Sequence, residues 1–214
     1  GSQRIGDLAW AAGDSRSRGF LLGATAGRTT LNGEGLQHED GHSHLLSATI
    51  PNCISYDPCF SYELAVIIQN GLERMIKNQE DVFYYITIMN ENYSHPEMPK
   101  NISEDIIKGI YKYSESKASG PKVQLMGSGV ILREVIGAAS ILEKDFNISS
   151  TIYSVTSFTE VRRNALDIQR WNMLNPDKTE KKSILDEIIL DLESPIITAT
   201  DYMKSFAEQI ATFL

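Results

Sequence analysis

The stretch "DVFYYITI", residues 81–88, carries the strongest strand signal in the chain and decides the class of fold. Most of its side chains are aromatic or β-branched, the types that favour strands. They form a nearly continuous apolar run, which is typical of a strand buried on both faces of a parallel sheet. Because parallel strands require crossover connections, helices are expected between this strand and its neighbours.

A helix and a second strand are predicted before this stretch. The second strand is the short run 52–56, which Asp57-Pro58 ends, and a further apolar run at 19–23 predicts a third strand. From Tyr62 onward the apolar residues recur at helical spacing. The face predicted to be buried carries Leu64, Ile68, Leu72 and Met75, and the face predicted to be exposed carries Glu63, Asn70, Glu73 and Lys77. Strand, helix and strand in this order predict a βαβ unit.

The same alternation returns in the last part of the chain. Strands are predicted at 122–126, 151–156 and 195–200, and a helix is predicted to begin at the capping-box pattern of Ser157 and Glu160. A last helix is predicted from Met203, Phe206, Ile210 and Phe213. Residues 101–120 lie in a polar stretch flanked by prolines and are predicted to be a linker. The sequence therefore predicts an α/β fold in two pieces, each with parallel βαβ units.

Composition excludes several classes of function. The net charge of −8 disfavours binding to nucleic acids or to anionic membranes, which select clustered Lys and Arg. No run of 18 apolar residues predicts a membrane-spanning helix, and the first residues lack the apolar core of a signal peptide. The two cysteines, Cys53 and Cys59, are expected to be buried, reduced thiols of a cytoplasmic protein.

The segment "GLQHEDGHSH", residues 35–44, concentrates three of the four histidines of the chain. His38-Glu39-x-x-His42 fits the H-E-x-x-H pattern, in which two histidines one helical turn apart bind zinc. The nearby glycines and Asp40 disfavour a helix, and His44 lies too close to serve as the usual third ligand. A glycine-hinged loop that presents histidine to other chemistry is the favoured interpretation.

Two shorter patterns carry weaker signals. Gly127-Ser128-Gly129 follows a predicted strand and precedes a helix, but Leu132 replaces the third glycine of a dinucleotide-binding fingerprint. A tight strand-to-helix turn explains the two glycines better. Arg162-Arg163 is interpreted as surface charge.

Several long motifs show a resemblance to a known family. "GRTTLNGEGLQHEDGHSH", "QRIGDLAWAAGD", "TIPNCISYDP", "YYITIMNENY", "KVQLMGSG", "YSVTSFTE", "RWNML" and "TDYMKSFAEQ" all occur in this chain. In their order along the chain they resemble the homodimeric bacterial form of the thiamine-diphosphate-dependent first component of the pyruvate dehydrogenase complex. The resemblance implies a transketolase-like fold, with part of a thiamine-diphosphate-binding domain and a Rossmann-like C-terminal domain.

The resemblance also implies that the chain is a piece of a longer protein. Residues 3–100 correspond to the later part of the middle, pyrimidine-binding domain, and residues 121–214 to a truncated C-terminal domain. The family's diphosphate and magnesium motif and its aminopyrimidine-binding glutamate lie earlier in the polypeptide. Thiamine diphosphate and Mg²⁺ are therefore expected in the parent enzyme, and neither is expected in this chain alone.

The implied activity is oxidative decarboxylation of pyruvate, with transfer of the acetyl group to a lipoyl group on an acyltransferase partner. The parent is expected to be a cytoplasmic homodimer. His38 matches the family's active-site histidine, and Glu34, Gln37 and His42 are candidates to support it. Arg4 resembles an arginine of the charged network near the cofactor. The resemblance assigns no metal ligand to these positions.

Three alternatives stay open. The isolated chain could be a structural or dimerisation module without activity, because one loop cannot hold a diphosphate and a metal ion. The parent could use a different 2-oxo acid. A zinc hydrolase built on His38 and His42 is the third and least favoured hypothesis.

Overall fold

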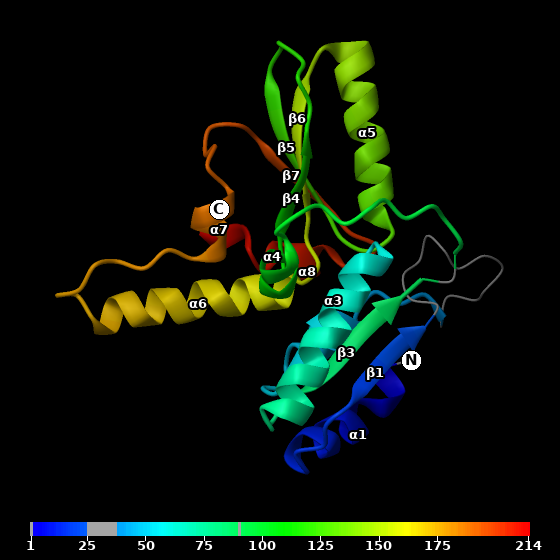
Figure 1. Cartoon of the computed structure of the whole chain (residues 1–214), viewed down its shortest axis with the longest axis vertical. Coiled ribbons are helices and arrows are strands. Elements are labelled where there is room, and N and C mark those ends of the chain that lie inside the picture. Colours follow the sequence, from blue (N-terminus) through cyan, green and yellow to red (C-terminus); the bar gives the residue numbers. More distant parts are fainter. Residues whose placement is uncertain (1, 25–37, 90) are drawn as a thin grey trace.

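Two α/β units, each built on its own sheet, make up the chain (Figure 1). The computed structural model describes residues 2–24, 38–89 and 91–214, with side chains from residue 5 onward. The N-terminal unit comprises α1 (Ser2–Asp14), β1 (Phe20–Ala24), α2 (Ser43–Ser47), β2 (Cys53–Tyr56), α3 (Ser61–Leu72), the π-helical turn η2 (Glu73–Lys77) and β3 (Phe83–Ile88). Its strands run parallel in the order β1-β3-β2, which confirms the predicted parallel βαβ unit.

The C-terminal unit contains the remaining elements. They are α4 (Ser103–Lys108), β4 (Tyr111–Glu115), β5 (Lys122–Gly127), α5 (Ile131–Phe146), β6 (Ser149–Ser154), α6 (Phe158–Leu174), α7 (Ile184–Ile188), β7 (Ile196–Ala199), α8 (Lys204–Glu208) and the 3-10 helix η3 (Ala211–Phe213). The strand order is β4-β6-β5-β7, with β5 parallel to both β6 and β7. The fold class predicted from the sequence is confirmed, and none of the described helices is long and apolar enough to cross a membrane.

The linker predicted at residues 101–120 requires a correction. This range contains α4 and β4, and β4 pairs antiparallel with β6 as an edge strand of the second sheet. In this strand Tyr111 is buried, Tyr113 is partly buried, and Lys112, Ser114 and Glu115 are exposed, as expected of an edge strand. The polar residues that indicate a linker in the sequence are therefore the solvent side of an antiparallel strand.

The buried face predicted for α3 and the turn η2 is confirmed only in part, since Met75 is buried and Leu64 and Ile68 are partly buried. Within α3 the buried residues are Glu63, Ile67 and Gly71, whereas Leu72 is half exposed. A Cβ atom at Gly71 would lie 2.8 Å from the ring of Phe20, so glycine permits close contact between this helix and β1. The buried positions of α3 therefore lie one residue before the predicted ones. The first of them is occupied by the Glu63 carboxylate and not by an apolar side chain.

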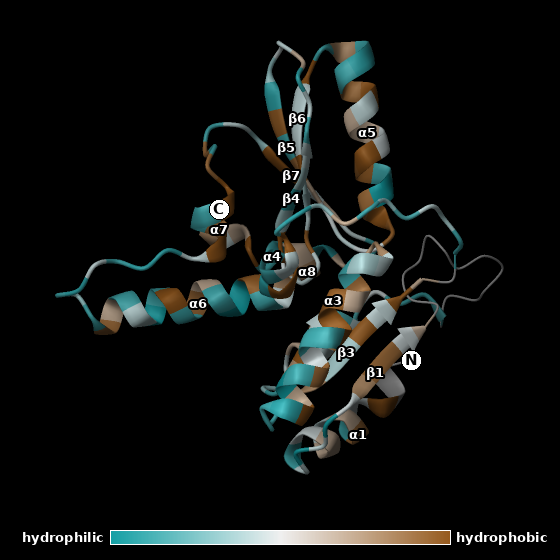
Figure 2. Ribbon diagram, in the orientation of Figure 1, coloured by the Kyte–Doolittle hydropathy of each residue, from teal (hydrophilic) through white to brown (hydrophobic). Residues whose placement is uncertain are grey.

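Apolar packing is continuous between the two units. One cluster joins Tyr56 and Ile86 of the first sheet to Ile106 of α4 and Tyr111 of β4. A second cluster joins Phe60, which precedes α3, to the face of the second sheet that α5 covers. Figure 2 shows hydrophobic residues along β1 and β3. The two units therefore share their cores across the junction.

The Glu63 carboxylate links the two units at this junction. Its Oε2 atom accepts hydrogen bonds from the backbone N–H groups of Cys59 (2.6 Å) and Phe60 (2.9 Å). Its Oε1 atom accepts from the hydroxyl groups of Tyr111 and Ser154, both at 2.7 Å. Burial raises the pKa of Glu63, and the four donors oppose that rise. One side chain thus caps α3 and attaches it to β4 and β6.

We predict that Glu63→Ala destabilises the chain by about 3 kcal/mol or more, because it leaves several buried donors without an acceptor. Glu63→Gln keeps one acceptor oxygen and should cost less. Urea unfolding followed by circular dichroism measures both variants. Glu73→Ala, which removes an exposed carboxylate from the next turn, serves as the control and should behave as the wild type. Equal stability of Glu63→Ala and Glu73→Ala would contradict the prediction.

Candidate functional site

The candidate site lies where the carboxyl ends of strands from both sheets meet. Asp57 follows β2, Thr87 lies near the end of β3, Ser128 follows β5 and Thr200 follows β7. Hydrogen bonds connect these residues. The edges at which the parallel strands of the two sheets end therefore face each other. Ligands of parallel α/β proteins bind at such edges, which makes this junction the place to examine.

A buried polar network fills the junction. The Asp57 carboxylate accepts hydrogen bonds from the hydroxyl groups of Thr87 (2.7 Å) and Ser128 (2.9 Å), and Ser128 lies 3.1 Å from the Thr200 hydroxyl. Gly129 has a φ of +50°, and a Cβ atom there would lie 2.6 Å from the Asp57 carboxylate. The strand-to-helix turn is therefore built around Asp57, in agreement with the tight turn favoured by the sequence.

Asp57 is electrostatically unusual. Burial raises its pKa to about 7, although the hydrogen bonds from Thr87 and Ser128 act in the opposite direction. The like charges of Asp201 and Glu63 raise the pKa further. The group therefore titrates near neutrality in the folded protein.

His44 is the second titratable group of the network. It is 1% exposed, and its ring stacks on Phe206 at 4.9 Å and meets the edge of Tyr202 at 4.8 Å between centroids. Burial lowers the pKa of His44 to about 4, and the charge of Asp40 only partly opposes this. His44 is therefore neutral at physiological pH.

The hydrogen bonds of Thr87 define the tautomer of His44. The Nε2 atom of His44 lies 2.9 Å from the Thr87 hydroxyl oxygen. The single hydroxyl proton of Thr87 is directed to acceptors, either the Asp57 carboxylate or the backbone oxygen of Tyr56 at 3.3 Å. When Asp57 is ionised, Thr87 therefore accepts from His44, and Nε2 carries the proton. The result is a relay from His44 through Thr87 to Asp57.

The described part of the histidine-rich segment is a loop that leads into α2. The Asp40 carboxylate accepts from the backbone N–H groups of His42 (3.1 Å) and Ser43 (3.0 Å), and from the Ser43 hydroxyl. The N–H group of Met203 donates to the backbone oxygen of Gly41 at 3.1 Å. The loop is therefore attached to the segment that precedes α8 in the C-terminal unit.

The helix required by the zinc hypothesis does not form. Residues 39–42 are not helical, because α2 begins only at Ser43, so His38 and His42 are not one helical turn apart. Among the described residues, no group of three or more His, Cys, Asp or Glu side chains is placed to hold a metal ion. The favoured loop interpretation agrees with this geometry.

The other predicted site residues are placed as follows. His38 and His42 are exposed, and their segment leads directly into the buried network through His44. Glu34, Gln37 and the side chain of Arg4 lie outside the described residues, so their assignments stay predictions. Cys53 and Cys59 are buried and free, as expected.

Sequence reasoning missed the buried members of the site. His44 was considered only as a zinc ligand, and Asp57 only as the residue that ends a strand. The signal for Asp57 was its position directly after a buried strand and before Pro58, at the edge where parallel sheets gather functional groups. Arg163, interpreted as surface charge, instead donates to the backbone oxygens of Cys53 (2.9 Å) and Ile50 (3.3 Å) across the junction.

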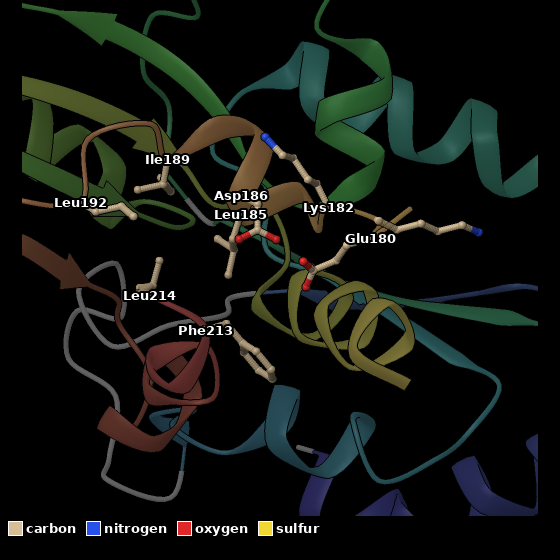
Figure 3. A pocket seen from close by; sticks show the side chains of 9 residues that line it. Glu180, Lys182, Leu185, Asp186, Ile189, Leu192, Phe213 and Leu214 are labelled. Atoms are coloured by element: carbon tan, nitrogen blue, oxygen red, sulfur yellow. The ribbon is translucent and has the colours of Figure 1, made fainter. Parts of the chain in front are cut away.

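A pocket elsewhere in the chain, shown in Figure 3, does not gather a comparable buried network. This pocket of about 340 Å³ lies between the segment around α7 and the last residues, Phe213 and Leu214. The Asp186 carboxylate on its wall caps α7 by accepting from Ser183 at 2.7 Å. Asp186 therefore serves local structure, and the junction is the better candidate.

Known structures share this architecture. The chain superposes on transketolase from Campylobacter jejuni with a TM-score of 0.72 and 16% identity, covering 99% of this chain and 28% of that protein. Transketolase from Leishmania mexicana gives a TM-score of 0.64 with 12% identity, covering 93% of this chain and 25% of that protein. The fold is that of a transketolase-like α/β protein.

Sequence comparisons identify the family. Residues 1–96 match the pyruvate dehydrogenase E1 component middle domain, and residues 109–213 match the transketolase-like TK C-terminal domain. The chain belongs to the family of pyruvate dehydrogenase E1 components. The E1 component of Escherichia coli K12 is 59% identical over 100% of this chain, that of Cupriavidus necator is 57% identical over 100%, and that of Pseudomonas aeruginosa is 60% identical over 98%. The chain spans 24% of the length of each of these relatives.

We predict that Asp57 makes the stability of the chain fall between pH 4 and pH 7. Its folded-state pKa of about 7 lies above the ordinary value, so the folded protein keeps a proton that the unfolded chain has released. This contribution is complete below about pH 4 and is lost as the pH rises toward 7.

The test compares urea-unfolding free energies of the wild type and Asp57→Asn at several pH values. The wild type should lose up to about 1.4 kcal/mol per pH unit relative to the variant within this window. Asp145→Asn, which removes an exposed carboxylate from α5, is the control and should run parallel to the wild type. A pH dependence unchanged by Asp57→Asn would disprove the assignment.

Proposed function

We propose that this chain forms part of the catalytic apparatus of a pyruvate dehydrogenase, in which the complete polypeptide decarboxylates pyruvate oxidatively and transfers the acetyl group to a lipoyl group. The observation that supports this most directly is identity of 50–60% with E1 components over 98–100% of the chain. The buried network at the carboxyl edges of both sheets provides a rigid base for that segment.

His38 is the residue to which we assign a chemical role. It is exposed at the start of the described loop, so a substrate can reach it. An imidazole can donate a hydrogen bond or a proton to the oxyanion that develops on the keto oxygen of pyruvate. Glu34, Gln37 and His42 are proposed to orient it, and Arg4 is proposed to contribute charge near the cofactor.

In the complete enzyme, thiamine diphosphate would stabilise the carbanion of the decarboxylation step, and a divalent metal ion, proposed as Mg²⁺, would hold its diphosphate. The described residues of this chain do not fit a metal and diphosphate site, since they gather no metal-binding group of side chains. Those parts of the site are proposed to come from other segments of the polypeptide.

The proposed partners are a second copy of the polypeptide and a lipoyl-bearing acyltransferase in the cytoplasm. Exposed apolar side chains on α1 and β1 support burial of this surface in a larger assembly. They include Leu8 (70% exposed), Leu22 (53%) and Trp10 (43%). Neither nucleic acid nor membrane is proposed as a partner, given the net charge of −8.

The chain alone is proposed to act as a structural unit without activity. Calorimetric titration of the chain with thiamine diphosphate and Mg²⁺ tests this. We expect no binding in the micromolar range, because the described residues include no group of three or more His, Cys, Asp or Glu side chains that could hold the metal ion. Micromolar binding would contradict the proposal.

We predict that His38→Ala lowers turnover of the full-length protein roughly 10²-fold without unfolding it, as expected for loss of a proton donor. Steady-state rates of pyruvate oxidation, together with thermal unfolding, measure both effects. His38→Asn keeps a hydrogen-bond donor but cannot release a proton, so it separates the two possible roles. Wild-type turnover in His38→Ala would remove His38 from the mechanism.

A further inference from the structure

The position of the histidine loop needs a structural cause. The loop leads into α2, which has five residues, and a helix this short is not stable by itself in water. The described segment must therefore be held by contacts to the rest of the protein. His44, in the first turn of α2, makes the most extensive of these contacts.

We propose that His44 and Thr87 act together as positioning residues that hold the histidine loop, residues 38–42, in its working place. This inference rests on the proposed function, because the loop is the element that presents His38. It adds a role for a histidine that does not itself face the substrate.

The surroundings of His44 leave its ring little freedom. Three aromatic rings, those of Tyr85, Tyr202 and Phe206, lie with their centroids 4.8–5.3 Å from it. Tyr85 belongs to the first sheet, whereas Tyr202 and Phe206 belong to the C-terminal unit. The imidazole is therefore enclosed by both units, and any displacement of α2 would break contacts with each of them.

Thr87 provides the directional part of the attachment. It is fully buried on β3, the central strand of the first sheet, so its hydroxyl group is fixed in space. It accepts from Nε2 of His44 at 2.9 Å and lies 2.7 Å from the Asp57 carboxylate. Because a hydrogen bond is directional while ring packing is not, Thr87 selects one orientation of the imidazole.

The attachment is continued on the loop itself. Asp40 caps the turn that contains Ser43, and Gly41 accepts a hydrogen bond from the Met203 N–H group in the C-terminal unit. These contacts flank His44 on its N-terminal side. The position set at His44 is therefore transmitted along four residues toward His38.

The first experiment measures the mobility of the loop in the full-length protein. Hydrogen exchange, read by mass spectrometry on peptides that cover residues 38–47, is compared between the wild type and Thr87→Val. The valine keeps the shape of the side chain and removes the hydroxyl group. We expect exchange in this segment to rise roughly tenfold, as local opening becomes easier.

Thr156→Val is the matched control. Thr156 is also fully buried at the junction, and its hydroxyl group donates to the backbone oxygen of Ile106 at 2.7 Å, away from the loop. The same chemical change there should leave exchange of residues 38–47 unaltered. Unchanged exchange in Thr87→Val, or an equal rise in both variants, would overturn the proposal.

The second experiment asks whether position matters for activity. His44→Phe keeps an aromatic ring but loses the bond to Thr87, whereas His44→Gln can place an amide N–H group near the position of Nε2. We expect His44→Phe to lower kcat roughly tenfold with KM within about twofold, and His44→Gln to recover part of the loss. Wild-type kcat in His44→Phe, while His38→Ala is inactive, would refute the positioning role. If His38→Ala were active, the proposed function would fail. The hydrogen-exchange comparison alone would then decide whether His44 and Thr87 hold the loop in position.

Discussion

The Asp57 carboxylate is the constraint on which the junction depends. Parallel strands end with polar groups at the edge of the sheet, and here two such edges face each other with Asp57, Thr87 and Ser128 buried between them. A buried carboxylate is costly unless donors surround it. Thr87 from one sheet and Ser128 from the other supply those donors, so the two units can approach only in the arrangement that satisfies Asp57.

Glu63 applies the same principle at a second point. It receives donors from its own helix terminus and from β4 and β6, and Arg163 adds bonds from α6 to backbone oxygens near β2. Apolar clusters fill the space between these polar contacts. Apolar packing alone tolerates sliding, whereas the hydrogen bonds of two buried carboxylates fix the register of one unit against the other. The site therefore has a defined geometry although it lies between units.

Local sequence patterns predict strands and helices well where an element buries one face or all of its faces. The strands at 81–88 and 122–126 and the cap at Ser157 follow from residue types within a few positions. The family resemblance supplied the fold as a whole. The linker is wrong because exposed polar residues such as Ser114 and Glu115 belong to an edge strand, and the predicted orientation of α3 is wrong at Glu63, which is buried and not exposed. Glu63 and Tyr111 satisfy each other across 48 positions of sequence, and no local period shows such a pair.

In the candidate site, too, some residues can be predicted from local sequence and others only from their surroundings. His38 could be assigned from its motif, but the role of His44 follows only from its surroundings. Both lie in one segment, yet the ring of His44 is enclosed by aromatic side chains and stays neutral because burial lowers its pKa to about 4. A histidine in that state can orient neighbours but cannot exchange protons with a substrate near neutral pH. In the proposed function, proton chemistry in this part of the loop is therefore assigned to the exposed His38, with the buried His44 as its support.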